Sequence, residues 1–127
     1  MKSFLLRVEL HHDTKPHDYN NLHIALYAIE FYRTILLSDN KWYDLPHAEY
    51  IKHSNIPLQT IRGQVCSAVE RAIPGILKAN KATREQKSYS LTLAESDWDE
   101  VEEAFKTKYI LYRSDAGSVL PPGKTLR

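Results

Sequence analysis

The first eleven residues alternate between apolar and polar side chains, which is the pattern of a half-buried β-strand. The apolar positions of one parity are Phe4, Leu6, Val8 and Leu10. Polar neighbours occupy most of the other parity, so we expect a strand over residues 3–11. A helical repeat of apolar residues follows, at Leu22, Ala25, Leu26 and Ile29. It predicts a first helix, with Asp18 as its N-cap.

Residues 31–53 predict two further strands joined by a hairpin. The segment "FYRTILL" is rich in β-branched and aromatic residues, and "SDNK" tolerates the backbone geometry of a tight turn. In the return strand the buried parity changes at Pro46. Because proline cannot donate to a β-ladder, we expect a β-bulge at Pro46–His47.

The second half of the chain predicts another helix, another strand and a C-terminal extension. The helix covers residues 54–73, with a buried stripe of Leu58, Ile61, Val65, Ala68, Val69 and Ala72. A basic loop leads to an alternating strand over "SYSLTLAE". The segment "SDWDEVEEAF" then forms a short acidic helix capped by Ser96, and "KYILYR" adds a short strand. We expect the acidic run of this helix to be a solvated face.

The predicted order is βαββαβ with a short helix and strand appended. Two helices on one face of a four-stranded antiparallel sheet make the ferredoxin-like plait, an α+β fold. An unrelated α+β sandwich with the same number of elements is the alternative. At 127 residues the chain fits one compact domain. We expect that domain over residues 1–112 and a flexible C-terminal tail over residues 113–127.

The overall charge and the single cysteine narrow the functional classes. The formal net charge is +1, so nucleic-acid binding would have to come from a local basic patch. Cys66 excludes an internal disulfide framework and suits a reducing compartment, as a small buried side chain. Arg7 and Glu9 interrupt the N-terminal apolar run, and no stretch approaches the roughly 18 apolar residues of a membrane span. We therefore expect a cytoplasmic protein without a membrane partner.

The sequence "LHHDTKPHDY" gathers His11, His12, Asp13 and His17 where the first strand ends. Three interpretations are open: a solvated turn, acid–base chemistry on RNA, or a metal site. Neighbouring strand residues point to opposite faces and the spacing matches no standard metal motif, so we expect no metal ion there. In the acid–base interpretation a histidine removes the proton of a 2′-hydroxyl, and Asp13 or Asp18 orients that histidine.

In a plait, a basic loop and two neighbouring strands that carry aromatic side chains would be able to contact RNA. It would also bring the hairpin at residues 38–41 to the histidine end. Three cations of the loop would hold phosphates there: Lys81, Arg84 and Lys87. Three residues of the neighbouring strands would stack on bases: Tyr32, Arg33 and Trp42. The strand residues also fit a sheet face that is covered by a partner subunit.

The segments "RVELHHDTKPHDYNNLHIAL", "FYRTI" and "YDLPHAEY" together resemble small bacterial and phage proteins grouped with the GhoS-type antitoxins. These are the endoribonuclease antitoxins of type V toxin–antitoxin systems. The resemblance covers roughly residues 3–95. It implies a ferredoxin-like fold, cleavage of a membrane-toxin messenger RNA without a bound cofactor, and a homodimer. The antitoxin type carries an arginine on its first helix, whereas "YNNLHIALYAIE" has none, so that residue is not transferred.

These patterns favour an RNA-binding protein with metal-independent endoribonuclease activity. The alternative is a non-catalytic accessory protein of phage or prophage type, which binds a protein or a nucleic acid as a dimer. An enzyme acting on a small molecule is a third class, but the chain has no glycine-rich phosphate loop and no nucleophile elbow. Substituting His11, His12 and His17 separates the first two classes, because a nuclease would lose cleavage and keep binding.

Overall fold

The computed structural model describes residues 2–11, 15–81, 86–108 and 112–113. Its helices are α1 (Pro16–Ala28), α2 (Leu58–Ala72), α3 (Trp98–Lys108) and the short 3₁₀ helix η1 (Ala79–Lys81). Its strands are β1 (Lys2–His11), β2 (Thr34–Leu36), β3 (Trp42–Asp44), β4 (Glu49–Ser54), β5 (Leu77–Lys78), β6 (Ser88–Ser96) and β7 (Tyr112–Arg113). The class is α+β, as the sequence predicts. Within these ranges no helix has both the length and the apolar character needed to cross a membrane.

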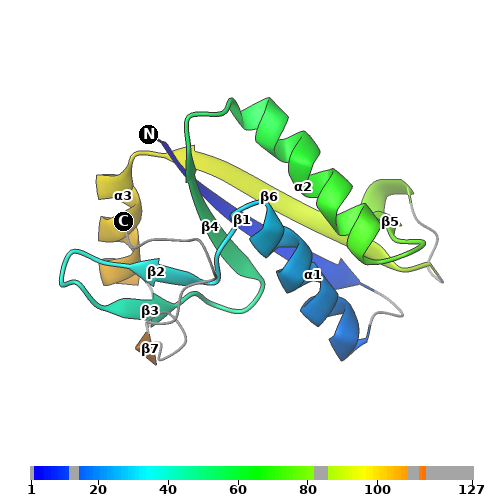
Figure 1. Cartoon of the computed structure of the whole chain (residues 1–127), viewed down its shortest axis with the longest axis horizontal. Helices are drawn as coiled ribbons and strands as arrows, with labels where there is room; N and C mark the ends of the chain where they lie inside the picture. The colour runs from blue at the N-terminus through cyan, green and yellow to red at the C-terminus, as the bar shows by residue number, and fades with distance from the viewer. Residues whose placement is uncertain (1, 12–14, 82–85, 109–111, 114–127) are drawn as a thin grey trace.

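The main sheet has the strand order β4-β1-β6-β5. β1 pairs antiparallel with β4 on one side and with β6 on the other, while β5 runs parallel to β6. The connection from β4 to β6 passes through α2, β5 and η1, and β1 lies between β4 and β6 in the sheet, which makes a split βαβ unit. α1 packs beside α2 on the same face of this sheet (Figure 1).

The sheet differs from the four-stranded antiparallel sheet that the sequence predicts. Residues 31–37 contribute one bridge to it, in which Tyr32 and Ile51 exchange two backbone hydrogen bonds of 2.8 Å each. β2 then leaves the main sheet and pairs with β3, which also pairs with β7, in a second small sheet. Ile35 and Leu37 are buried in a separate core there, and this burial favours the departure of β2. The outer place beside β6 is taken by β5, which is absent from the predicted order.

The predicted β-bulge at Pro46–His47 is wrong, because the chain breaks there between two strands that belong to different sheets. β3 ends at Asp44 and β4 begins at Glu49, and Ala48 before it has a positive φ of 65°. The Ala48 carbonyl accepts a hydrogen bond from the Val8 N–H at 3.0 Å, which brings the chain back to β1. The break therefore separates the two sheets, since β3 belongs to the small one and β4 to the main one.

The main core lies between the sheet and the two helices α1 and α2. β1 contributes Phe4, Leu6 and Val8, each fully buried, which confirms the predicted alternation. The helices meet them with the apolar faces that the helical repeat predicts. Those residues are Leu22, Leu26, Ile61, Val65, Ala68 and Val69. Burial of one large apolar side chain contributes about 1.5–3 kcal/mol. Because α1 and β1 both contribute side chains to this core, its packing holds the start of α1 close to the end of β1.

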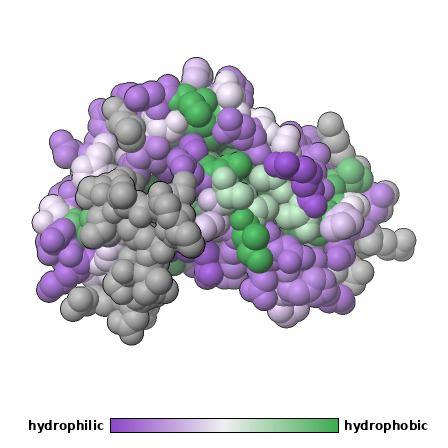
Figure 2. All heavy atoms as spheres, in the orientation of Figure 1, coloured by the Kyte–Doolittle hydropathy of each residue, from purple (hydrophilic) through white to green (hydrophobic). Residues whose placement is uncertain are grey.

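Apolar side chains also gather on the outer surface of the helix pair, where Figure 2 shows them between α1 and α2. The groove there is lined by Asn21, Ile24, Ala25, Ala28, Ile29, Ala68, Arg71 and Ala72. Ile24 is 69% exposed. Half of the lining residues are alanines, and their small side chains on both helices leave the space that forms the groove.

A second core lies on the opposite face of the sheet, between α3 and the small sheet. Its buried members are Ile35, Leu37, Leu45, Ile51, Val101 and Phe105. Leu5 packs against it, so the apolar residue that interrupts the N-terminal alternation belongs to this core. The acidic run of α3 is not entirely a solvated face. Glu102 is buried and accepts a hydrogen bond from the Ser38 N–H at 2.5 Å, which ties the β2–β3 hairpin to α3.

Candidate functional site

α1 begins shortly after β1, and Asp18 closes its first turn. Pro16 takes the first helical position, where a backbone N–H has no partner within the helix in any case. The Asp18 carboxylate accepts a hydrogen bond from the Lys15 N–H at 2.8 Å. Asp18 is therefore the third residue of the helix, where its carboxylate caps the Lys15 N–H, and not the N-cap that the sequence predicts. This geometry holds the first turn of α1 beside the end of β1, where the Tyr19 hydroxyl accepts a hydrogen bond from the Leu10 N–H at 3.1 Å.

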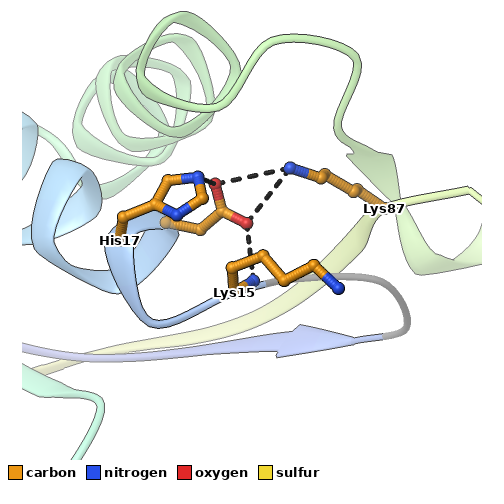
Figure 3. Close-up of polar contacts among 4 residues, drawn as sticks. Lys15, His17 and Lys87 are labelled. Carbon is orange, nitrogen blue, oxygen red and sulfur yellow. Dashed lines mark hydrogen bonds and ion pairs between the residues drawn. The ribbon is translucent and has the colours of Figure 1, made fainter.

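A lysine 69 residues further along the chain completes the cluster (Figure 3). The Lys87 ammonium lies 3.2 Å and 3.5 Å from the two Asp18 carboxylate oxygens, and His17 Nε2 lies 3.4 Å from one of them. The exposed fractions of the side chains are 4% for Asp18, 28% for Lys87 and 67% for His17. A carboxylate this deeply buried requires such partners. We name Lys15, His17, Asp18 and Lys87 the α1 N-terminal cluster.

The cluster keeps the Asp18 carboxyl ionised. Burial by itself raises the pKa of this group. The hydrogen bond from the Lys15 N–H, the hydrogen bond and charge of Lys87, and the charge of His17 together outweigh burial, so the pKa lies below its usual value of 3.8. The Lys15 ammonium is exposed and points away from the carboxylate (Figure 3). The surface over Asp18 is therefore cationic, and the N-terminus of α1 adds to that charge.

His11 ends β1 on the sheet face that lies away from α1. It shares the parity of Arg7 and Glu9, which is opposite to that of the helix-facing Val8. Its Nε2 lies 2.9 Å from the hydroxyl oxygen of Ser90 in β6, in a contact whose donor depends on the histidine tautomer. The structure therefore brings His17 to Lys87, but it directs His11 to the other face of the sheet.

Three of the predicted site residues lie outside the described residues: His12, Asp13 and Arg84. Lys81 ends η1, where the structure describes the backbone. Lys87 is thus the one cation of the predicted phosphate-binding loop whose side chain lies in the described part of the chain. That place is the α1 N-terminal cluster.

Two of the three predicted base-stacking residues, Tyr32 and Trp42, lie in different sheets. Tyr32 forms the bridge to β4, and its ring stands edge-on to that of Tyr27, with centroids 5.7 Å apart. Trp42 pairs with Leu36 in the small sheet. The predicted approach of the hairpin to the histidines is wrong, because its Ser38 bonds to α3 on the other side of the molecule from the start of α1 (Figure 1).

A second group of polar aromatic side chains lies next to the first, between α1 and β4. Its members are Tyr19, His23, His47 and Tyr50, which we name the tyrosine–histidine cluster. Ring centroids are 4.9 Å apart for Tyr19 and His47, and 5.7 Å apart for His23 and Tyr50. The one local signal for it in the sequence is the four-residue spacing of Tyr19 and His23 on α1. The other contacts join residues that are far apart in the chain.

His23 and Tyr50 are both uncharged near neutral pH. His23 Nδ1 lies 2.7 Å from the Tyr50 hydroxyl oxygen. Burial, followed by the charges of Arg33 and His47, lowers the pKa of His23 to about 4. Burial raises the pKa of Tyr50 far above its usual value, although Arg33 acts against it. Arg33 is therefore placed by the fold at the tyrosine–histidine cluster, where it supplies positive charge.

Substituting His23 by glutamine is expected to flatten the pH dependence of stability between pH 6.5 and about 4. Folding lowers the pKa of His23 from 6.5 to about 4, so its contribution to stability is present above pH 6.5 and is lost as the pH falls toward the folded value. The ring is only partly buried, so we expect a loss of about 1–2 kcal/mol over this interval. Urea unfolding across this pH range measures it.

The matched control for this prediction is Asn20→Gln, which changes an exposed residue without a titratable group on the same helix. It should leave the pH profile of stability unchanged. Equal pH slopes for the unchanged chain and for His23→Gln would contradict the prediction and show that His23 titrates freely in the folded state.

Comparisons with known proteins give no match. No protein-family model matches this chain, and no curated protein and no solved structure matches it. In the described part of the chain, no three histidine, cysteine, aspartate or glutamate residues are grouped as ligands of a metal ion would be. A functional interpretation therefore depends on the two clusters and on the sequence resemblance.

Proposed function

We propose that this chain binds RNA along a cationic strip at the N-terminal end of α1, and that it cleaves the RNA without a metal ion. The observation that carries the proposal is the contact of the exposed His17 with the buried, ionised Asp18 beside Lys87. The resemblance to GhoS-type antitoxins supports it. The split βαβ unit with two helices on one face supports a ferredoxin-like plait as the underlying fold.

The cationic strip crosses both clusters. Its charged or titratable members are Lys87, Lys15, His17, His47 and Arg33. Tyr19 joins the two halves, because it follows Asp18 in α1 and its ring lies against His47. Cationic side chains are the usual partners of nucleic-acid phosphates. The Tyr19 ring adds a surface on which an unpaired base can stack.

RNA cleavage needs no metal ion, because the nucleophile is the 2′-hydroxyl of the RNA itself. In the proposed step, His17 removes the proton of that hydroxyl as its oxygen attacks the neighbouring phosphorus. The bond from phosphorus to the 5′-oxygen breaks, and the leaving oxygen takes a proton from water. The products are a 2′,3′-cyclic phosphate and a free 5′-hydroxyl. Asp18 orients the imidazole, and the ammonium groups of Lys15 and Lys87 stabilise the charge on the phosphate.

The cleavage test incubates labelled RNA with the purified chain, with and without a chelator. We expect cleavage in both conditions, and we expect His17→Ala to lower its rate by at least about 100-fold while RNA binding persists. The fold should survive this change, since His17 is 67% exposed. His11→Ala is the matched control, because that ring lies on the other face of the sheet. Cleavage that requires His11 and not His17 would contradict the assigned role.

Binding is tested separately with single substitutions along the strip. Lys15→Gln and Arg33→Gln should each weaken RNA binding and lower its salt dependence by roughly one phosphate contact. Lys41→Gln, at an exposed position in the β2–β3 hairpin, is the control for a general loss of charge. If all three variants lose the same affinity, the strip is not the RNA site.

Binding without catalysis is the second candidate function, and one observation favours it. His11 and His17 face different sides of the sheet, so these two imidazoles do not act together as base and acid. Strip-dependent binding by an unchanged chain that leaves the RNA intact would support this non-catalytic function and remove the catalytic half of the proposal.

A further inference from the structure

The two edges of the main sheet are protected to different extents. At one edge, β4 is engaged where Tyr32 and Ile51 exchange backbone hydrogen bonds. At the other edge, β5 pairs with β6 only at Ser88 and Tyr89. β6 continues to Ser96, yet among the described residues no strand pairs with this side of it after Tyr89. η1 contacts β6 just beyond β5, and the rest of this side of β6, toward Ser96, has no strand partner among the described residues. We name this side of β6 beyond β5 the open edge.

The alternation along the strand shows which backbone groups face this edge. The Leu77 N–H donates to the Lys87 carbonyl at 3.1 Å, so Lys87 and every second residue after it present their backbone groups to the β5 side. Beyond β5 these residues are Leu91, Leu93 and Glu95. Their N–H and C=O groups have no backbone partner on that side within the described part of the chain.

The open edge lacks the features that usually prevent strands from adding to a sheet. Between Ser90 and Ser96 there is no lysine and no proline, and the register with β1 has no bulge. Glu95 is the single charged residue of this segment. A row of outward N–H and C=O groups of this kind can accept another strand by backbone pairing.

We propose that a second copy of this chain pairs with β6 along the same edge, about a two-fold axis at Leu93. In an antiparallel pair of identical strands, this axis sets Leu93 opposite Leu93 of the second copy, and Leu91 opposite its Glu95. Every outward N–H of the three residues then meets an outward carbonyl. An axis at Leu91 would instead set Leu93 opposite Tyr89, whose outward side β5 already occupies.

Charge complementarity favours a second copy over an unrelated extended chain. Arg62 of α2 and Leu91 line one pocket beside the open edge. Leu91 and Glu95 both have the parity of the helix-facing Tyr89. In the proposed register Glu95 of the second copy therefore comes next to Leu91 on the side where Arg62 lies. The two-fold axis repeats this contact, so two Arg62–Glu95 ion pairs flank the central strands.

The charge-exchange experiment uses sedimentation velocity over protein concentrations from about 1 µM to about 500 µM. We expect a monomer–dimer equilibrium for the unchanged chain. Arg62→Glu and Glu95→Arg should each raise the dissociation constant by at least about tenfold, because each places like charges together. The double variant restores opposite charges and should recover the dimer. Arg71→Glu, on the same helix but in the α1–α2 groove, is the control and should not change the equilibrium.

Hydrogen exchange provides a readout that requires no substitution. The amides of Leu91, Leu93 and Glu95 should become protected as the concentration rises, whereas those of Thr92 and Ala94 face β1 and should be protected throughout. A chain that stays monomeric, protection that does not change with concentration, or a double variant as weak as the sum of the single variants would each overturn the proposal. Dissociation by Arg71→Glu would also overturn it, in favour of the groove between α1 and α2. RNA binding is measured independently, so the failure of one proposal leaves the other intact.

Discussion

Replacing Asp18 by alanine is expected to lower the free energy of unfolding by about 2–4 kcal/mol, because a first-turn hydrogen bond and a buried ion pair are lost together. The Lys15 N–H loses its acceptor at 2.8 Å. Lys87 loses the carboxylate that lies 3.2 Å from its ammonium, and its partial exposure lets water replace only some of that interaction. Urea unfolding near neutral pH, followed by circular dichroism, measures the change.

The same substitution should also reduce the sensitivity of the fold to acid. Folding lowers the pKa of Asp18, so its carboxylate contributes stability above the unfolded value of 3.8, and this contribution is lost as the pH falls through the folded value. The unchanged chain should therefore lose stability below about pH 4 more steeply than Asp18→Ala does.

The single variants Asp18→Asn and Lys87→Met and the double variant Asp18→Asn/Lys87→Met measure the ion pair separately from the helix cap. Each single variant leaves one charged partner, buried Asp18 or half-buried Lys87, without its counterpart. The double variant removes both charges. The double variant should therefore cost less than the sum of the single ones, with a coupling of about 1–3 kcal/mol. Strictly additive costs would show that the contact in Figure 3 does not stabilise the fold.

Lys87 also illustrates how far sequence reasoning reaches. The basic loop predicts a cation near the end of β1, and Lys87 does lie there, beside His17. Its contact with Asp18 could not be predicted, because 69 residues separate the two and no local pattern links them. The structure therefore makes Lys87 a tether between β6 and α1, in addition to its proposed role at the phosphate.

Local periodicity accounts for the parts of the fold that were predicted well. The period of two at Phe4, Leu6 and Val8 and the helical stripe of α2 each follow from the burial of one face, so β1, α2 and the α+β class were predicted from the pattern alone. The tyrosine–histidine cluster was not predicted. Its members come from α1, from the break before β4 and from β4 itself, and their approach depends on how Ala48 turns the chain.

The second core was missed because the prediction assigned only one buried face to the sheet. Leu5 and Ile51 lie on the face opposite α1 and α2, where a plait alone would leave them to solvent or to a partner subunit. The structure covers them with α3 and the small sheet instead. The acidic residues of α3 mask the apolar stripe that carries Val101 and Phe105, so charge dominated the interpretation of that segment.

Phe105→Ala is expected to cost about 3–5 kcal/mol, since it leaves a cavity in this second core. Phe105 is 1% exposed, and Trp98 packs against the same core. Tryptophan fluorescence therefore reports on this core, while far-ultraviolet circular dichroism is dominated by the helices of the whole chain. Phe105→Leu is the matched control, and its smaller loss of volume should cost less than half as much.

The unfolding transition of Phe105→Ala is measured once by fluorescence and once by circular dichroism. Whether both transitions shift together shows whether the two cores unfold as one unit. β1 and β4 carry side chains into both cores, Leu6 and Tyr50 on one face and Leu5 and Ile51 on the other. Loss of the second core should therefore weaken the strands that support the first, and both transitions of Phe105→Ala should shift by the same amount. A fluorescence transition that shifts alone would mean that α3 and the small sheet unfold as a separate unit. The main sheet with α1 and α2 would then hold the α1 N-terminal cluster without help from the C-terminal extension.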